Sequence, residues 1–374
     1  MPSIKTNVIH GKLDWFPEVD VEQYGELYKQ GKSMSMEFEE VKSQKSGERT
    51  PYCGMTKAEV LKTKAELRRK DGYAPPTAFE EALSTAGIKV TGSFADPISK
   101  FYEFSDTRPL FPEFVADRVY AGLLKNSLVP EFVMAETVID STTFQKIYLQ
   151  DDEDDRQLKN VAKRSELPET VIEVGSQVVR LDMYGRYVKM SKIDMKQQRA
   201  NVFGKFMERV GQQIQIDQTD LMFYRLINGD GNSGSTPQTT VTAAATGAGE
   251  LSLNDAINWA LGAPTPYVTD KFVMRKANLV KWYGRLYDAS TTSVPGKDDM
   301  VVFPKAYEWD KSTITTNYAW GVDSNYAVEM ITNGGPQVDA ENLVREVSEG
   351  TAIWMMYEFA IADGYAVTMF DLSS

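Results

Sequence analysis

Apolar residues recur at helical spacing in two long segments of the chain. The first, RPLFPEFVADRVYAGLLKNSLVPEF at 108–132, begins beside a proline and predicts an amphipathic helix. The apolar side of this helix comprises Phe114, Val115, Val119 and Leu123. The second segment, Asn201–Asn228, predicts the longest helix of the chain, and Gly229 ends it. Its apolar positions, three and four residues apart, are Phe203, Phe206, Met207, Val210, Ile214, Leu221 and Tyr224.

Strand-like runs lie on both sides of a highly charged segment. Strands are predicted at Phe132–Ile139, Thr143–Leu149 and Ser176–Met190. Between the last two lies Asp151–Gly175, which is charged almost throughout and indicates the polar tip of a long β-hairpin. A protruding hairpin is not stable alone in water, so we expect it to lie on a partner surface. Its acidic run Asp151–Asp155 fits no EF-hand spacing, which favours a solvated turn over a calcium site.

The second half of the chain predicts a further α/β unit. A loop rich in Gly, Ser, Thr and Ala at Gly229–Gly249 is a natural domain boundary. The elements expected after it are a helix capped by Asn254 and running to Leu261, strands at 271–274 and 300–303, a helix at 277–286 and a loop tip at 295–299. The apolar run Ala352–Phe370 predicts a terminal hairpin that turns at Asp363-Gly364, because Asp-Gly favours a tight hairpin turn.

The first 107 residues differ from the rest, since they are polar and interrupted by Pro and Gly. Thr56–Arg69 predicts a helix in which Thr56 and Glu59 form a capping box. Short helices in a polar stretch do not build a core alone, so we expect this region to be disordered or to lie along another surface. Basic residues outnumber acidic ones in Val41–Lys70, which favours a solvated helical face, with a DNA-contacting arm as the alternative.

Composition excludes several kinds of chemistry. The chain has 374 residues, with one cysteine, Cys53, and one histidine, His10. These exclude an intrachain disulfide and disfavour Ser-His-Asp, Cys-His and multi-histidine metal sites. GKS at 31–33 lacks phosphate-loop spacing, and NGDGNSG at 228–234 lacks the closing glutamate of a calcium loop. We therefore predict no catalytic residues, no cofactor and no metal.

Charge and hydropathy define the expected environment. The formal net charge is −12, whereas a protein whose task is to wrap DNA is normally basic. The N-terminal residues lack an apolar signal-peptide region, and no segment approaches the roughly 18 apolar residues of a membrane span. We expect a soluble protein that is made in a cytoplasm and does not contact a membrane.

The order of these segments over Arg108–Ser374 resembles that of tailed-bacteriophage major capsid proteins with the Hong Kong 97-type fold. The segments that carry the resemblance are LFPEFVADRVYAGLLKNSLVPEF, VVRLDMYGRYVKMSKIDMKQ, NVFGKFMERVGQQIQIDQTDLMFYRLINGDG and IWMMYEFAIADGYAVTMF. The resemblance implies an α+β fold with an extended N-arm, an E-loop hairpin, a P-domain with a long spine helix, and an A-domain. On this sequence the parts are an N-arm at 1–107, an E-loop at 151–177, an A-domain at 250–339 and P-domain segments at 108–150, 178–249 and 340–374.

The resemblance also implies a function without catalysis. Copies of the chain would assemble as hexamers and pentamers into an icosahedral shell around double-stranded DNA, in the host cytoplasm and then in the virion. The implied partners are further copies, scaffold and portal proteins, a decoration protein, and packaged DNA through weak interior contacts. An uncleaved arm with a separate scaffold is favoured, because the sequence begins at Met1.

Three sets of contact residues follow from this mapping. The E-loop set is Asp151, Asp152, Asp154, Asp155, Arg156, Lys159, Lys163, Arg164, Glu166 and Glu169. The N-arm set is Trp15, Phe16, Tyr24, Lys62, Arg68 and Arg69. The axial-loop set of the A-domain is Ser290, Lys297, Asp298 and Asp299. Some members of the family form a covalent cross-link through an E-loop lysine, and Lys159 and Lys163 are formally available for it.

Two alternative functions remain open. An encapsulin-like nanocompartment shares the fold but stores protein cargo, and the long N-terminal region argues against it. A carboxylate-using hydrolase is the second alternative, although the sequence nominates no particular pair of acids. Particle content separates the first alternative from a virion shell, and activity of a dissociated monomer would support the second.

Overall fold

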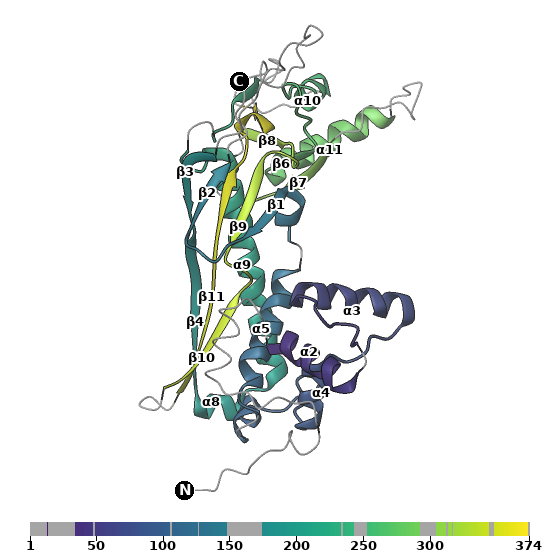
Figure 1. Cartoon of the computed structure of the whole chain (residues 1–374). Coiled ribbons are helices and arrows are strands. Elements are labelled where there is room, and N and C mark those ends of the chain that lie inside the picture. The colour runs from purple at the N-terminus through teal and green to yellow at the C-terminus, as the bar shows by residue number, and fades with distance from the viewer. Residues whose placement is uncertain are drawn as a thin grey trace. The chain divides into compact units, whose positions relative to one another are not determined.

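A computed structural model of the chain contains both helices and strands in the part that it describes (Figure 1). The structure describes residues 13, 34–47, 49–104, 107–125, 127–147, 174–232, 235–242, 253–291, 304–311, 313–315, 317–343 and 348–372. The first of two units comprises Met1–Ser127, Met183–Ile216 and Gly334–Met355. The second comprises Leu128–Asp182, Asp217–Asn333 and Met356–Ser374. The mixture of helices and strands confirms the predicted α+β class.

The first unit is mainly helical. Its elements are α2 (Met34–Ser46), α3 (Lys57–Asp71), α4 (Ala78–Thr85), the 3-10 helix η1 (Ile98–Tyr102), α5 (Leu110–Leu123), α8 (Lys192–Gln197) and the first part of α9 (Ala200–Asn228). The helices predicted at α5 and α9 are confirmed, and α9 is the longest with 29 residues. Side chains of these helices share one core with Val338 and Ile353, which lie on strands of the same unit.

The N-terminal helices pack on their own chain, which corrects the expectation that this stretch builds no core. Met34 and Phe38 of α2, together with Phe79 and Leu83 of α4, are buried in the same core as α5. The capping box predicted at Thr56 is confirmed, and a second one begins α4. The prediction of a disordered stretch is therefore wrong for the described residues between 34 and 104, and the surface along which these helices lie belongs to the same chain.

Ion pairs join the N-terminal helices to one another and to α5. Lys57 of α3 contacts Glu113 and Asp117 of α5, and the Lys57 and Glu113 side chains are buried. Two further lysines, on α2 and α3, pair with α4 as Lys42–Glu81 at 2.6 Å and Lys64–Glu80 at 2.5 Å. Each of these lysines meets a carboxylate, so the contacts between these helices include paired charges as well as apolar side chains.

Helices α5 and α9 approach each other at two glycines. A Cβ atom on Gly122 would overlap the carbonyl oxygen of Glu208, and one on Gly211 would overlap that of Val119. The backbones are therefore in direct contact, and no larger residue fits at either position. The close approach places aromatic side chains of the two helices together, and the rings of Phe111 and Phe203 stack with centroids 5.7 Å apart.

The second unit contains a five-stranded sheet with strand order β5-β12-β8-β6-β7. These strands are β5 (Thr239–Thr242), β6 (Lys271–Met274), β7 (Lys305–Glu308), β8 (Tyr318–Val322) and β12 (Val367–Asp371). The β6–β7 and β5–β12 pairs are parallel, and β8 is antiparallel to both β6 and β12. Helices α10 (Leu253–Ala260) and α11 (Lys276–Thr291) pack on the sheet through Trp259 and Trp282.

The elements predicted for this α/β region are largely confirmed. The strand at 271–274 is β6, and the helix predicted at 277–286 is α11, which is longer. Asn254 lies inside α10 and is not its cap. The loop predicted at 229–249 as a natural domain boundary contains strand β5 and lies within the second unit. The strand at 300–303 and the loop tip at 295–299 lie outside the described residues.

The remaining strands surround one long strand. They are β1 (Val133–Val138), β9 (Val328–Thr332), β10 (Gln337–Leu343), β4 (Asp182–Ser191) and β11 (Ser348–Ile361). In the first unit β11 pairs with β10 and β4, and in the second unit it pairs with β9, which pairs with β1. The long strand predicted at Ser176–Met190 is in fact two strands: β3 (Val174–Arg180) pairs with β2 (Thr143–Ile147), whereas β4 pairs with β11.

The terminal hairpin predicted at Ala352–Phe370 is wrong. Strands β11 and β12 do not pair with each other but join different sheets. Asp363 has extended backbone and its carboxylate accepts a hydrogen bond from Tyr365 N at 2.8 Å, which begins the 3-10 helix η3 (Gly364–Ala366). This turn replaces the two-residue hairpin loop, so the chain leaves one sheet and enters the other.

We predict that Gly122→Ala and Gly211→Ala each destabilise the protein by about 3 kcal/mol or more, because the new methyl group meets backbone that has no room to yield. Gly204→Ala in α9 is the matched control. Its Cβ would lie 3.1 Å from Phe114 Cζ and 3.4 Å from Arg118 Cδ, which are side-chain atoms that can shift. Denaturant unfolding measures the three changes, and equal values for Gly122→Ala and Gly204→Ala would contradict the role of the helix crossing.

Candidate assembly surfaces

Most of the contact residues predicted from the sequence lie outside the described residues. This holds for the whole E-loop set, for Trp15, Phe16 and Tyr24, and for Lys297, Asp298 and Asp299. Ser290 belongs to helix α11, which corrects its predicted place in the axial loop. The strands that flank the E-loop segment are described, and β2 and β3 pair antiparallel with Phe144 opposite Val179, as expected for the base of a hairpin. The contacts made by its tip stay a prediction.

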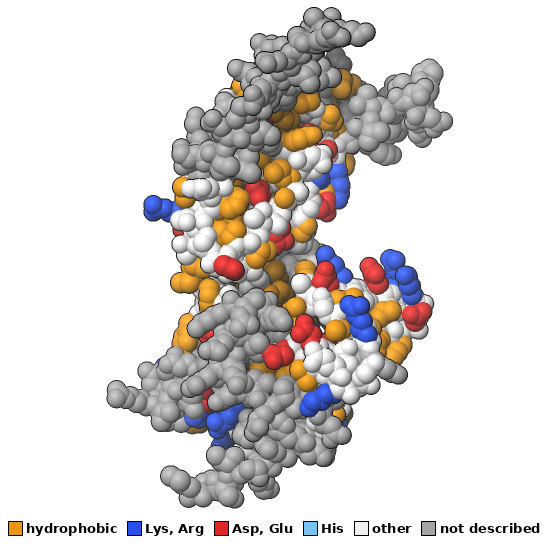
Figure 2. Space-filling model, viewed as in Figure 1, with side chains coloured by type: hydrophobic (Ala, Val, Ile, Leu, Met, Phe, Trp, Pro, Cys, Tyr) orange, Lys and Arg blue, Asp and Glu red, His pale blue; other side chains and the backbone are white. Residues whose placement is uncertain are grey.

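Three N-arm residues lie on the exposed surface of α3. Lys62, Arg68 and Arg69 are all exposed. Figure 2 shows basic and acidic side chains side by side on this helical part of the molecule. Arg68 and Arg69 lie in the last turn of α3, where positive charge interacts favourably with the helix dipole. These positions fit the predicted solvated face, and the alternative contact with DNA stays a prediction.

A set of exposed apolar side chains was not found from the sequence. It consists of Met183, Tyr184, Tyr187, Ile193, Val202 and Phe206, and we call it the exposed apolar set. Met183, at 66% exposure, and Tyr184 are adjacent on β4 and point to opposite faces, so this part of the strand is open on both sides. Two successive large apolar residues in a predicted strand, here Met183 and Tyr184, are a sequence signal that could have predicted exposed apolar side chains on both faces of β4.

The apolar stripe predicted for α9 is partly wrong. Phe206, placed in the buried stripe by its spacing, is 47% exposed, and Tyr224 is also exposed. Phe203, Met207 and Val210 are buried as predicted. Spacing alone did not separate these positions, because it does not tell which neighbouring elements cover a helix face.

The loop Lys89–Asp96 displays one aromatic ring. Phe94 is 87% exposed, the largest value for a large apolar side chain among the described residues. The ends of the loop are joined by two hydrogen bonds, from Lys89 N to Asp96 Oδ2 at 2.7 Å and from Asp96 N to Lys89 O at 2.8 Å. Its tip is tied to the start of α9, since Arg199 donates to Ser93 O and Asn201 to Gly92 O. The backbone of the loop that carries the ring is therefore held in place while the ring faces solvent.

An open groove of about 680 Å³ lies beside this loop. It is lined by Val90 to Ser93 of the loop, by Arg118 of α5 and by residues of α9 that include Val202 and Lys205. Glu208, also in the lining, accepts hydrogen bonds from the ammonium groups of Lys125 and Lys205. These bonds hold the pKa of Glu208 below its ordinary range.

A separate cavity of about 550 Å³ lies among α2, α3, α4 and α5. Tyr52, Lys57, Lys64, Glu80 and Asp117 are among its lining residues. The lysines and acids named here already pair with one another, so a charged ligand would have to break an ion pair to bind. We assign the cavity no ligand.

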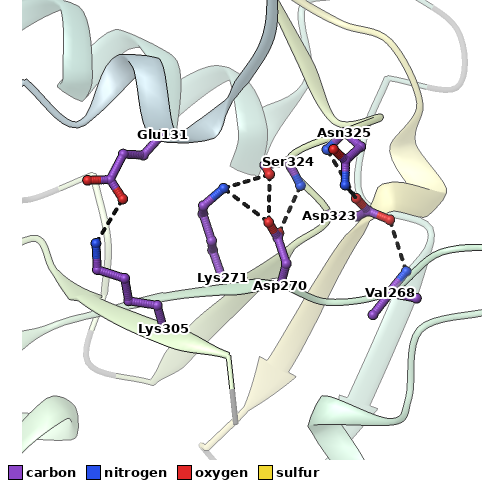
Figure 3. Close-up of polar contacts among 8 residues, drawn as sticks. All are labelled: Glu131, Val268, Asp270, Lys271, Lys305, Asp323, Ser324 and Asn325. Carbon is purple, nitrogen blue, oxygen red and sulfur yellow. Dashed lines mark hydrogen bonds and ion pairs between the residues drawn. The ribbon is translucent and has the colours of Figure 1, made fainter. Parts of the chain in front are cut away.

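The second unit contains a group of polar contacts around the turn between β8 and β9 (Figure 3). Asp270 accepts hydrogen bonds from Ser324 N at 2.9 Å and from Ser324 Oγ at 2.6 Å, and it pairs with Lys271 at 3.0 Å. Asp323 accepts from Val268 N at 2.9 Å. The two carboxylates thus fasten the turn to the segment that enters β6.

This group contains the serine and lysine that some hydrolases use, but its geometry fits a structural role. Ser324 accepts a hydrogen bond from Lys271 Nζ at 2.6 Å and donates its own proton to Asp270, so the hydroxyl is committed to the turn. Within the described part of the chain, no group of three or more His, Cys, Asp or Glu side chains could hold a metal ion. No helix in the same part is long and apolar enough to cross a membrane.

No protein-family model and no curated protein matches this sequence. Among solved structures, the virus-like particle from Pyrococcus furiosus shares 11% identity and a TM-score of 0.47 over 69% of this chain and 98% of its own. The capsid of the native GTA particle shares 11% identity and a TM-score of 0.49 over 68% and 91%. A chain of Mycobacterium phage Bobi shares 12% identity and a TM-score of 0.42 over 66% and 90%. This chain is similar in structure to these proteins.

We predict that Asp270→Ala lowers the free energy of unfolding by about 1–2 kcal/mol, because a charge-assisted hydrogen bond to the Ser324 backbone is lost. The control is Lys305→Ala, which removes the exposed pair with Glu131 drawn in Figure 3 and should cost less than about 1 kcal/mol. Chemical denaturation measures both, and a Lys305→Ala loss as large as that of Asp270→Ala would contradict the assigned role.

A second prediction concerns the pH dependence of the Lys89–Asp96 loop. Burial alone would raise the pKa of Asp96, but hydrogen bonds from Lys89 N and from the Lys100 ammonium hold this pKa below its ordinary value of 3.8. The pKa of Asp96 is lower in the folded protein than in the unfolded chain. The stabilisation that its carboxylate provides is therefore full above pH 3.8 and is lost as the pH falls through the pKa of the folded protein.

The comparison of wild type with Asp96→Asn tests this. The wild type should have the higher Tm at pH 6, and the difference should disappear as the pH is lowered below the folded pKa of Asp96. Asp71→Asn, at the exposed end of α3, is the control and should change Tm little, both at pH 6 and below the folded pKa of Asp96. A constant difference between wild type and Asp96→Asn across this range would contradict the assignment.

Proposed function

We propose that this protein is a major capsid protein of the tailed-bacteriophage type, whose copies assemble into an icosahedral shell. The observation that carries the proposal is the exposed apolar set. The set comprises six large apolar side chains that are exposed on β4, α8 and α9, and exposed apolar side chains of this size can serve as contacts with partners. A strand open on both faces, as β4 is from Asp182 to Tyr187, has the form of an element that other chains cover.

The order of elements supports the same proposal. A helix at α5 precedes a charged segment flanked by the paired strands β2 and β3. A long helix, α9, follows, then an α/β region with β6, α11 and β7, and finally two apolar strands. This succession is the one on which the sequence resemblance rests. In this proposal α9 is the spine helix, and the region 250–339 is the A-domain.

The shell would be held together by many modest contacts. A single exposed ion pair contributes about 0–1 kcal/mol, so the charges of residues 151–169 serve register and partner choice more than strength. In a closed symmetric assembly each copy makes the same contacts with several neighbours, and the combined effect exceeds that of any one contact. The arm role is now confined to the residues before Met34, which include Trp15, Phe16 and Tyr24.

The finer assignments follow from the same proposal. Copies would form hexamers and pentamers in the host cytoplasm, with scaffold and portal proteins as partners and a decoration protein as a further one. Contact with packaged double-stranded DNA would be weak and local, because the net charge is −12. Lys62, Arg68 and Arg69 are the described residues that we nominate for it. The protein would act by assembly and not by catalysis.

The experiment that tests the proposal is assembly of the purified chain, read by negative-stain microscopy. We expect icosahedral particles, and particles isolated with their natural content should hold DNA. Protein cargo in place of DNA would favour the encapsulin-like alternative. Monomers under all assembly conditions would refute the shell role.

Removal of Asp152–Glu169, bridged by Gly-Ser, should leave a folded subunit that does not build stable shells, because the charged segment would no longer bridge neighbouring copies. Circular dichroism and thermal unfolding of the variant check that the subunit is folded. Particles of normal yield and stability from this variant would show that the segment is not an intersubunit clamp.

A further inference from the structure

Phe94 presents a whole aromatic ring to solvent on a loop that is held in one conformation. An exposed ring loses the free energy of apolar burial, and a fixed loop loses conformational entropy. Five hydrogen bonds hold this loop: the two that join Lys89 and Asp96, those from Arg199 and Asn201, and one from Lys100 Nζ to Asp96 Oδ2 at 3.0 Å. Such a preorganised apolar side chain is typical of an anchor that fills a pocket on a partner.

The groove beside the loop has the chemistry to receive such a ring. Val90 and Val202 provide apolar walls. Arg118 supplies a guanidinium that already lies 5.3 Å from the centre of the Phe114 ring, so it is placed among aromatic contacts. The lysines around Glu208 are paired with it, so they favour no anionic ligand. At about 680 Å³ the groove has room for a phenyl ring and the loop that carries it.

We propose that Phe94 of one copy inserts into the groove beside the Lys89–Asp96 loop of a second copy. Both halves of the contact lie next to each other on the first unit, because Val90 to Ser93 line the groove and Phe94 follows them directly. Copies related by a twofold rotation can therefore each offer the ring and receive one, which needs no other protein. The inference rests on the proposed function and adds a specific intersubunit contact to it.

The size of the contact indicates when it forms. One ring and a loop tip bury far less than the roughly 1,000 Å² that a specific interface needs by itself. The isolated subunit should therefore stay monomeric with Phe94 exposed, and the contact should form only where other contacts in the shell hold the copies together.

The first test compares Phe94→Ser with Tyr73→Ser. Tyr73 is also exposed, at 65%, and lies between α3 and α4 outside the groove lining, so it is the matched control. Both variant subunits should unfold at the wild-type temperature, since neither ring is buried in the subunit. Phe94→Ser should reduce the yield of stable particles about tenfold, whereas Tyr73→Ser should assemble as wild type does.

The second test is a cross-link between copies in the Cys53→Ser background. Subunits with Phe94→Cys are mixed with subunits with Val202→Cys, assembled and oxidised. Each chain then carries one cysteine, so a disulfide between the two kinds of subunit can only join different copies. A mixture of Tyr73→Cys with Val202→Cys is the control and should give no such dimer on a non-reducing gel.

The outcomes separate the two levels of the proposal. Normal particles from Phe94→Ser, together with no Phe94→Cys to Val202→Cys disulfide in intact shells, would overturn the loop contact and leave the shell role standing. Failure of the wild type to form particles would overturn the proposed function and this contact with it. A disulfide in intact shells together with loss of particles from Phe94→Ser would support the contact.

Discussion

The first unit depends on the backbone contact between α5 and α9. At Gly122 and Gly211 the two helices come so close that a single methyl group would overlap a carbonyl oxygen of the opposite helix. The close approach of the two backbones lets side chains along both helices contact one another. Phe111 and Val119 of α5 therefore share one core with Met207 of α9. Helices α2 and α4 add their apolar side chains to that core, so the N-terminal region folds because the crossing exists.

Charge is used in two different ways in this unit. Lys57, Lys42 and Lys64 are directed at carboxylates of α4 and α5, where they join helices. Arg68 and Arg69 remain exposed at the end of α3. All five belong to one basic stretch, 41–70, and a count of its charges gives no means of separating the paired lysines from the exposed arginines. The paired lysines join helices whose apolar side chains share the core of α5 and α9, which the composition of the stretch did not predict.

Several large apolar side chains of the described residues are exposed to solvent. The exposed apolar set and the ring of Phe94 lie on regular elements and on a hydrogen-bonded loop, where their positions are set by the fold. A shell subunit needs such preset contacts, since each copy must meet several neighbours in the same geometry. The polar group around Asp270, by contrast, fastens a turn within the chain, and its serine and lysine are occupied there.

The sequence by itself determined the long helices, the capping box at Thr56 and strand β6, because spacing and capping are local properties. Only the tertiary structure decided that β11 and β12 enter different sheets, that Phe206 and Phe94 face solvent, and that Gly122 must be a glycine. The physical reason is that these depend on which surface lies opposite a residue. The sequence shows which side chains are apolar and how they are spaced, but residues that are distant in the chain decide what covers them.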